Sequence, residues 1–169
     1  MPSCLSKQRA VANIVLAGLG GQGVIKASDI VADTAFRCGL DVKKSEIHGM
    51  SQRGGSVTSD IRFGEEVFSP MVPPGEADCL VVLAPDQVEN NRWQLRPGGV
   101  LITPSLIEER LLKSKKSLNV ALLGALSACL DLPEERWIEA ICANLPEKLH
   151  AMNLEAFQTG RSAGMRLQP

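Results

Sequence analysis

The sequence contains no tyrosine, and aromatic residues make up only 4% of its 169 residues. Proteins that bind single-stranded nucleic acids stack the bases on aromatic side chains and follow the phosphate backbone with an excess of basic residues. The net charge of this chain is −1, so it offers neither feature. We therefore expect no nucleic-acid partner.

Long hydrophobic runs are also missing. The richest apolar stretch, residues 120–130, is interrupted by Gly124 and Ser127 and is shorter than the roughly 20 residues that a membrane span needs. The first residues lack the apolar segment of a secretory signal peptide. These two features predict a cytoplasmic protein without a membrane partner.

The five cysteines are few and scattered: Cys4, Cys38, Cys79, Cys129 and Cys142. None of them is part of a Cys-x-x-Cys pair, which argues against an iron–sulfur cluster, a structural zinc or a thioredoxin-type site. Cys79 and Cys129 lie inside apolar runs, where cysteine usually serves as a small core residue. We expect no metal site in this chain.

What the sequence does contain is typical of one globular α/β domain over residues 1–169, with 44% apolar and 22% charged residues. Apolar residues alternate or cluster as in strands in several segments and recur at helical spacing in others. The predicted strands are 13–17, 40–47, 56–63, with a hairpin turn at 64–65 into 66–68, 79–83 and 100–102. The predicted helices are 24–38, 86–94, 105–113, 119–130, 134–144 and 147–158.

The alternation of strands and helices predicts an α/β fold, as a three-layer α/β/α Rossmann-like sandwich. The hairpin makes the sheet mixed but mostly parallel, and the C-terminal part is helical. The continuous apolar run of residues 79–83 is typical of a central strand that is covered on both faces.

A glycine-rich loop follows the first predicted strand and leads into the first predicted helix. Its glycines Gly18, Gly20 and Gly23 have the spacing of a dinucleotide-binding fingerprint. A P-loop would need lysine and then serine or threonine directly after the last glycine, and Val24 and Ile25 stand there instead. An NAD site would need an acidic residue at the end of the second strand; Asp41 comes too early, and Lys43 and Lys44 stand where the acid is expected. The adenylating enzymes use a similar double-glycine turn, but the acidic, arginine and four-cysteine motifs that usually accompany it are not evident here. Two alternatives remain open: a dinucleotide whose phosphorylated ribose binds the lysines, and glycines that only permit tight packing.

A second polar loop, residues 48–56, lies between two extended segments. Its Gly54 and Gly55 allow close approach of a ligand, and Arg53 is suited to bind phosphate or carboxylate. His48, at the start of the loop, is a residue type that commonly transfers protons in enzymes. This combination is richer than a simple connection requires and indicates a second ligand-binding loop.

Together, the segments Gly-Leu-Gly-Gly-Gln-Gly-Val at 18–24 and Lys-Ser-Glu-Ile-His-Gly-Met-Ser-Gln-Arg-Gly-Gly-Ser-Val at 44–57 resemble the gamma module of 2-oxoacid:ferredoxin oxidoreductases. The run Leu-Leu-Gly-Ala-Leu at 122–126 fits the same family. The resemblance covers residues 11–161 and is strongest to members that act on indolepyruvate. One departure is the segment of residues 100–118, which is shorter than in the family.

The resemblance implies a subunit of a heteromeric enzyme that is inactive alone and serves anaerobic metabolism. The enzyme oxidatively decarboxylates an arylpyruvate or another 2-oxoacid to an acyl-CoA, with an iron–sulfur protein as electron acceptor. Thiamine diphosphate, magnesium and iron–sulfur clusters are expected on a large catalytic partner subunit, which passes electrons to ferredoxin. Coenzyme A is the possible co-substrate, and the isolated chain is a possible homodimer.

The candidate site residues lie in the two loops, residues 18–23 and 48–56. We expect these loops to meet at the C-terminal edge of the sheet. His48 and Arg53 are the candidates for a catalytic role. The expected cofactor-binding residues are Gly18, Gly20, Gly21, Gln22, Gly23, Ser51, Gln52, Arg53, Gly54 and Gly55. Two other functions stay open: a stand-alone nucleotide- or CoA-binding regulatory module, and a purely structural subunit.

Overall fold

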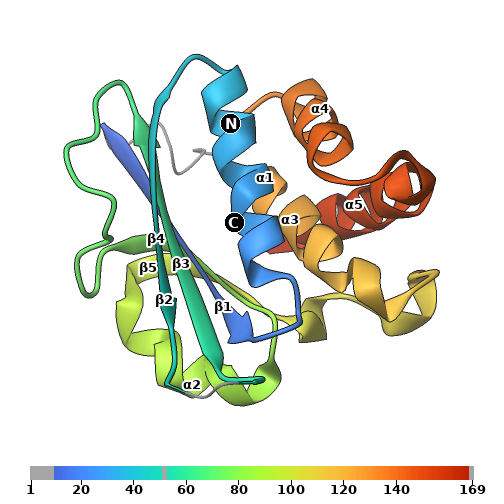
Figure 1. The fold of residues 1–169 in the computed structure, drawn as a ribbon, viewed down its shortest axis with the longest axis horizontal. Coiled ribbons are helices and arrows are strands. Elements are labelled where there is room, and N and C mark those ends of the chain that lie inside the picture. Colours follow the sequence, from blue (N-terminus) through green and yellow to red (C-terminus); the bar gives the residue numbers. More distant parts are fainter. Residues whose placement is uncertain (1–9, 51–52, 168–169) are drawn as a thin grey trace.

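The computed structural model describes residues 10–50 and 53–167 of the chain. A five-stranded sheet in the order β2-β3-β1-β4-β5 forms its centre (Figure 1). The strands are β1 (Val11–Leu19), β2 (Asp41–His48), β3 (Ser56–Gly64), β4 (Ala77–Val82) and β5 (Leu95–Ile102). Strand β1 is parallel to β4, and β4 is parallel to β5, whereas β3 is antiparallel to both β1 and β2. The prediction of a mixed sheet is therefore confirmed; β3 runs opposite to the other four strands, so two of the four neighbouring pairs are parallel and two are antiparallel.

The helices cover the two faces of the sheet unequally. They are α1 (Val24–Arg37), α2 (Val88–Asn91), α3 (Leu118–Cys129), α4 (Glu134–Asn144) and α5 (His150–Gly164). Helices α1, α3, α4 and α5 lie on one face, as Figure 1 shows. Their buried side chains, such as Ile30, Leu122 and Trp137, form the larger core with Ile14 and Leu16 of β1.

The opposite face is covered by a thinner layer. There Val15 and Leu80 of the sheet form a smaller core with Val72 of the loop 65–76 and with Val88 of α2. Strand β4 is buried along its whole length between the two layers. The predicted α/β class with a helical C-terminal part is confirmed, and one of its outer layers consists of a loop and a short helix.

The predicted hairpin at residues 64–68 is wrong. Strand β3 pairs with β2 and β1, so the hairpin of this sheet is β2–β3, two strands that residues 49–55 connect in the sequence. After β3 the chain continues as a loop, in which the Val67 N–H donates to Asp41 Oδ2 at 2.8 Å. The Val72 N–H likewise donates to Asp60 Oδ2 at 2.9 Å. The Val67 and Val72 N–H groups are thus hydrogen-bonded to carboxylates and not to the backbone of a neighbouring strand.

The predicted helix at 105–113 is also wrong, because residues 104–117 form only three short 3₁₀ turns. Among residues 105–113, only Ile107 is buried. Short helices are stable in proteins mainly when they bury an apolar face, and here only Ile107 is buried, with Leu106 and Leu112 partly buried against the core. The remaining helix predictions agree with the structure to within a few residues, except that α5 continues to Gly164. The predicted core positions Cys79 and Cys129 are both buried.

Candidate functional site

The two glycine loops meet at the C-terminal end of β1, as the sequence predicts. The Gly20 N–H donates to the Gly55 carbonyl at 2.8 Å. A Cβ atom at Gly20 would lie 3.4 Å from the Gly54 nitrogen, so the two loops are in close contact at this position. The first loop enters α1, and the second is the turn between β2 and β3. One hydrogen bond therefore joins the two segments that the sequence singles out.

The backbone of the first loop exposes the N-terminus of α1. Gly21 and Gly23 have φ values of +88° and +80°, which other residues rarely adopt. Gly23 begins the helix, and in the described part of the chain no side chain caps it and its first turn has no acidic residue. The first N–H groups of a helix lack intrahelical acceptors and carry partial positive charge. This end of α1 therefore favours an anion.

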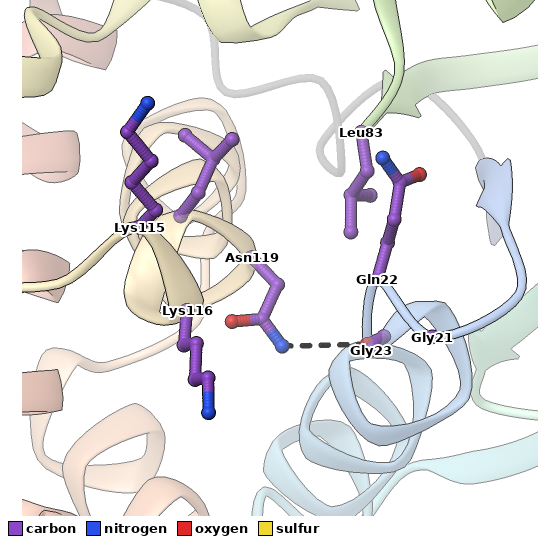
Figure 2. A pocket seen from close by; sticks show the side chains of 8 residues that line it. Gly21, Gln22, Gly23, Leu83, Lys115, Lys116 and Asn119 are labelled. Carbon is purple, nitrogen blue, oxygen red and sulfur yellow. Dashed lines mark hydrogen bonds between the residues drawn. The ribbon is translucent and has the colours of Figure 1, made fainter.

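A groove of about 530 Å³ lies beside this helix N-terminus. Figure 2 shows the first glycine loop on one side of it and a basic turn on the other. The residues that line it are Gly21, Gln22, Gly23, Leu83, Lys115, Lys116, Leu118 and Asn119. Asn119 bridges the two sides, because its Nδ2 donates to the Gly23 carbonyl at 3.4 Å.

A second hollow of about 370 Å³ lies on the other side of the same loop. Its walls are mostly apolar and consist of Leu19, Gly20, Gly21, Gly23, Val24, Ile25, His48 and Val57. His48 has an exposed side chain, with Nε2 lying 3.7 Å from Glu46 Oε2. Gly21 and Gly23 line both spaces, so the loop separates a polar groove from an apolar hollow.

A charged cluster next to His48 ties β2 to α1. The Lys44 ammonium lies 2.5 Å from Asp29 Oδ1 and 2.6 Å from Glu46 Oε1. Burial disfavours the charge on Lys44, but the hydrogen bonds that its ammonium group donates to these two carboxylates outweigh this effect and raise the Lys44 pKa. Lys44 therefore stays charged and holds β2 and α1 together. His48, two residues beyond Glu46 on the same strand, lines the hollow.

The structure brings most of the predicted site residues together. Gly20, Gly21 and Gly23 line the spaces beside the loop, and Arg53, Gly54 and Gly55 lie in the adjoining turn. Ser51 and Gln52 lie outside the described residues.

Two of the predicted site residues, Gln22 and Gly18, serve the conformation of the loop itself. The Gln22 side chain accepts the Leu19 N–H at 2.8 Å. A Cβ atom at Gly18 would lie 2.8 Å from that same Gln22 oxygen, so Gly18 leaves room for this bond.

Sequence reasoning missed the opposite wall of the groove, namely Leu83, Lys115, Lys116, Leu118 and Asn119. The available signal was the basic run at 113–116, followed by an asparagine directly before the apolar helix. Its position beside a loop almost a hundred residues earlier in the chain depends on tertiary packing.

Two further findings concern the described residues only. Residues 10–50 and 53–167 contain no group of three or more His, Cys, Asp or Glu side chains that could hold a metal ion. Within the same ranges, every helix is too short or too polar to cross a membrane.

The chain matches the family model described as pyruvate ferredoxin/flavodoxin oxidoreductase over residues 13–110 and 104–163. It is 49% identical over 197 aligned positions to the indolepyruvate oxidoreductase subunit IorB of Archaeoglobus fulgidus, covering 93% of this chain and 97% of the relative. The alignment has more positions than this chain has residues, so the relative contains residues that this chain lacks. The two matched segments meet at 104–110, within the region that the sequence predicts to be shortened.

Two solved structures share the fold. The gamma subunit of a keto/oxoacid ferredoxin oxidoreductase from Geobacter sulfurreducens superposes with a TM-score of 0.79 and 24% identity, covering 92% of this chain and 99% of that chain. A 2-oxoglutarate:ferredoxin oxidoreductase from Magnetococcus marinus, with 2-oxoglutarate, coenzyme A and succinyl-CoA bound, gives a TM-score of 0.82 at 23% identity. The match covers 94% of this chain but only 32% of that larger chain.

Proposed function

Because the chain belongs to the pyruvate ferredoxin/flavodoxin oxidoreductase family, we propose that it is the subunit of an enzyme that oxidises indolepyruvate or another arylpyruvate. It is a subunit of a 2-oxoacid oxidoreductase, as its relatives are. The observation that carries the choice of substrate class is the 49% identity to the indolepyruvate oxidoreductase subunit over 93% of the chain.

In this proposal the 2-oxoacid loses carbon dioxide, its acyl group is transferred to the sulfur of coenzyme A, and the released electron pair passes to ferredoxin. Thiamine diphosphate with its magnesium ion, when bound on the large partner subunit, activates the keto carbon, and iron–sulfur clusters there carry the electrons. The described residues of this chain offer no set of metal ligands for such a cluster. We therefore assign the electron transfer to the partner and ligand positioning to this chain.

The role of this chain is then to hold the phosphate groups of coenzyme A. The uncapped N-terminus of α1 presents N–H groups and partial positive charge to the groove. Arg53 lies in the adjoining turn, within the same pair of joined loops. A guanidinium binds a phosphate through parallel hydrogen bonds, so Arg53 is suited to complete this site. His48, at the rim of the apolar hollow, is the candidate for a proton transfer.

The subunit assignment is tested by anaerobic purification of the tagged chain from its native host. The eluate is assayed for viologen reduction with indolepyruvate and coenzyme A. We expect a large iron–sulfur subunit to co-purify together with this activity. A chain that elutes alone and inactive, yet binds nucleotide or coenzyme A at micromolar concentration, would instead identify a free-standing regulatory module. The chain's lack of residues that its relative contains favours this second candidate.

The role of Arg53 is tested by R53A in the purified complex. Loss of a charged hydrogen bond to phosphate is expected to raise the KM for coenzyme A by a factor that corresponds to about 1–3 kcal/mol. The KM for the 2-oxoacid should stay constant. R92A is a matched control, because Arg92 pairs with Glu89 on α2 and its neighbouring turn, outside both loops. Unchanged assembly and kinetics in R53A would contradict the role.

A further inference from the structure

We propose that Lys115 and Lys116 bind two different phosphate groups of coenzyme A in the 530 Å³ groove, and so select its phosphorylated nucleotide end. The inference rests on the proposed function, in which coenzyme A binds at the glycine loops. It adds a recognition element from the segment 100–118, which lies far from both loops in the sequence.

The groove has the volume and the mixture of apolar and polar surface that ligand pockets commonly have. Ligand pockets commonly measure about 300–1,000 Å³ and combine apolar walls with a few polar groups. Here Leu83 and Leu118 provide apolar surface, while the two lysines and Asn119 provide polar groups. An adenosine unit can therefore contact the leucines while its phosphates face the lysines and the N-terminus of α1.

The charges in the groove are all of one sign. Among the described residues that line it, two are lysines and none is acidic. Lys115 lies 3.3 Å from Glu109, but both side chains are largely exposed, and such surface pairs contribute little. For Lys116, the described residues provide no carboxylate within salt-bridge distance. Both ammonium groups therefore remain available to an anionic ligand.

The directions of the two lysines indicate a ligand with more than one phosphate. Figure 2 shows the two side chains leaving the turn on either side of Asn119, with their ammonium groups pointing away from each other. A single phosphate would engage one of them. Coenzyme A carries a diphosphate and a separate 3′-phosphate on the same adenosine, so each lysine can hold a different group.

The turn that carries these lysines is fixed in place. Ser114 Oγ accepts the Lys116 N–H at 3.2 Å, and Ser117 Oγ donates to the Ser114 carbonyl at 2.7 Å. Asn119, two residues further on, donates to Gly23. The backbone is thus held against the glycine loop while the side chains of Lys115 and Lys116 stay exposed. The turn is therefore preorganised for binding a ligand.

The experiment compares K115Q and K116Q with K113Q in the purified oxidoreductase complex. Lys113 belongs to the same basic run but pairs with Glu155 and does not line the groove, so it is the matched control. Binding of radiolabelled coenzyme A and of dephospho-coenzyme A is measured by equilibrium dialysis, together with the KM for each. Each charge-assisted phosphate contact should change the affinity about tenfold.

The expected result is that K115Q and K116Q each bind coenzyme A about tenfold more weakly, while kcat and the KM for the 2-oxoacid stay constant. One of the two variants should no longer distinguish coenzyme A from dephospho-coenzyme A. K113Q should behave as the unaltered protein does.

Two outcomes would overturn the inference in distinguishable ways. If K115Q and K116Q bind coenzyme A as the unaltered complex does while R53A binds it weakly, the basic turn is not part of the site and the proposed role of the loops stands. If R53A, K115Q and K116Q all bind it normally, the coenzyme lies elsewhere and both proposals fail.

Discussion

Gly21 differs from the other glycines of the first loop in what surrounds its α-carbon. Its φ is +88°, and apart from its two neighbours in the chain no described residue has an atom within 4 Å of the position that a Cβ atom would take. At Gly18, by contrast, a Cβ atom would lie 2.9 Å from Cγ2 of Val24. Gly18 is therefore required by packing, whereas Gly21 borders the open space on both sides of the loop.

The substitution G21A tests this difference. Alanine in the left-handed backbone conformation of residue 21 should lower the free energy of unfolding by about 1 kcal/mol, measured by urea denaturation. Gly39 is a matched control, because its φ is +77° and its Cβ position is equally open, but it lies at the end of α1 away from the groove. We expect similar destabilisation in G21A and G39A and weaker coenzyme A binding in G21A alone. Equal binding by both variants would contradict a role of Gly21 at the ligand.

The carboxylates of Asp41 and Asp60 both accept backbone N–H groups of the loop 65–76, but their pKa values are shifted in opposite directions. The Val67 N–H lowers the Asp41 pKa below its ordinary value of 3.8. Burial raises the Asp60 pKa above 3.8 and outweighs the hydrogen bond from the Val72 N–H. Asp41 therefore contributes stability above pH 3.8 that is lost as the pH falls through its folded-state pKa. Asp60 costs stability as the pH rises from 3.8 through its folded-state pKa.

The variants D41N and D60N should show these opposite trends in unfolding free energy measured between pH 3 and pH 7. The deficit of D41N relative to the unaltered protein should shrink as the pH falls. D60N keeps an acceptor oxygen for Val72, so it should gain relative to the unaltered protein as the pH rises. A pH trend of the same sign in both variants would contradict the assignment.

At the scale of elements, the close packing of α3 against α5 positions the basic turn. Gly160 of α5 faces the Ala121 carbonyl of α3, and Gly124 of α3 faces the Phe157 carbonyl of α5, each so closely that a Cβ atom would clash. Helices can approach this closely only where the contact residues are small. Because α3 begins directly after the turn of Lys115–Ser117, this packing also fixes one wall of the groove.

The variant G160A should therefore destabilise the protein, although alanine is the better helix former by about 0.5–1 kcal/mol. Overpacking is expected to cost about 1–3 kcal/mol, measured by thermal or urea denaturation. S162A is the control, because Ser162 is exposed on the same helix. If G160A were as stable as S162A, the two helices would have room that this structure does not show.

At the scale of the whole molecule, several large apolar side chains face outward. Among the described residues, Phe68 is 85% exposed, Phe36 71% and Trp93 62%. These side chains lie on α1, in the loop 65–76 and in the turn after α2, where a partner subunit could contact them. The chain lacks residues present in its relative, so its contacts with a partner subunit need not be identical to those of the relative.

The isolated chain is expected to self-associate, because surfaces for a large partner are then uncovered. Sedimentation velocity over a range of concentrations should show a homodimer, and addition of the large catalytic subunit should replace it with a heteromer. A monomer at every concentration would contradict the homodimer. A homodimer that persists beside the large subunit would show that self-association uses a different surface.

The sequence by itself determined the family, the class of fold and the pairing of two glycine loops. The signals were local: short runs of apolar residues specify strands and helices, and the loop segments 18–24 and 44–57 are long enough to be specific. It also predicted the meeting of the loops, since both follow strand ends at the same edge. It failed where apolar spacing was weak, at 64–68 and at 105–113.

Only the tertiary structure decided what faces the glycine loop. Gly23 and Asn119 are far apart in the sequence, and their contact depends on how α3 packs on α5 and on the sheet. No local pattern encodes that distance. The loop 65–76 is a similar case, because the acceptors for its N–H groups are side chains of β2 and β3. Local patterns specify elements, whereas contacts between distant segments specify the groove.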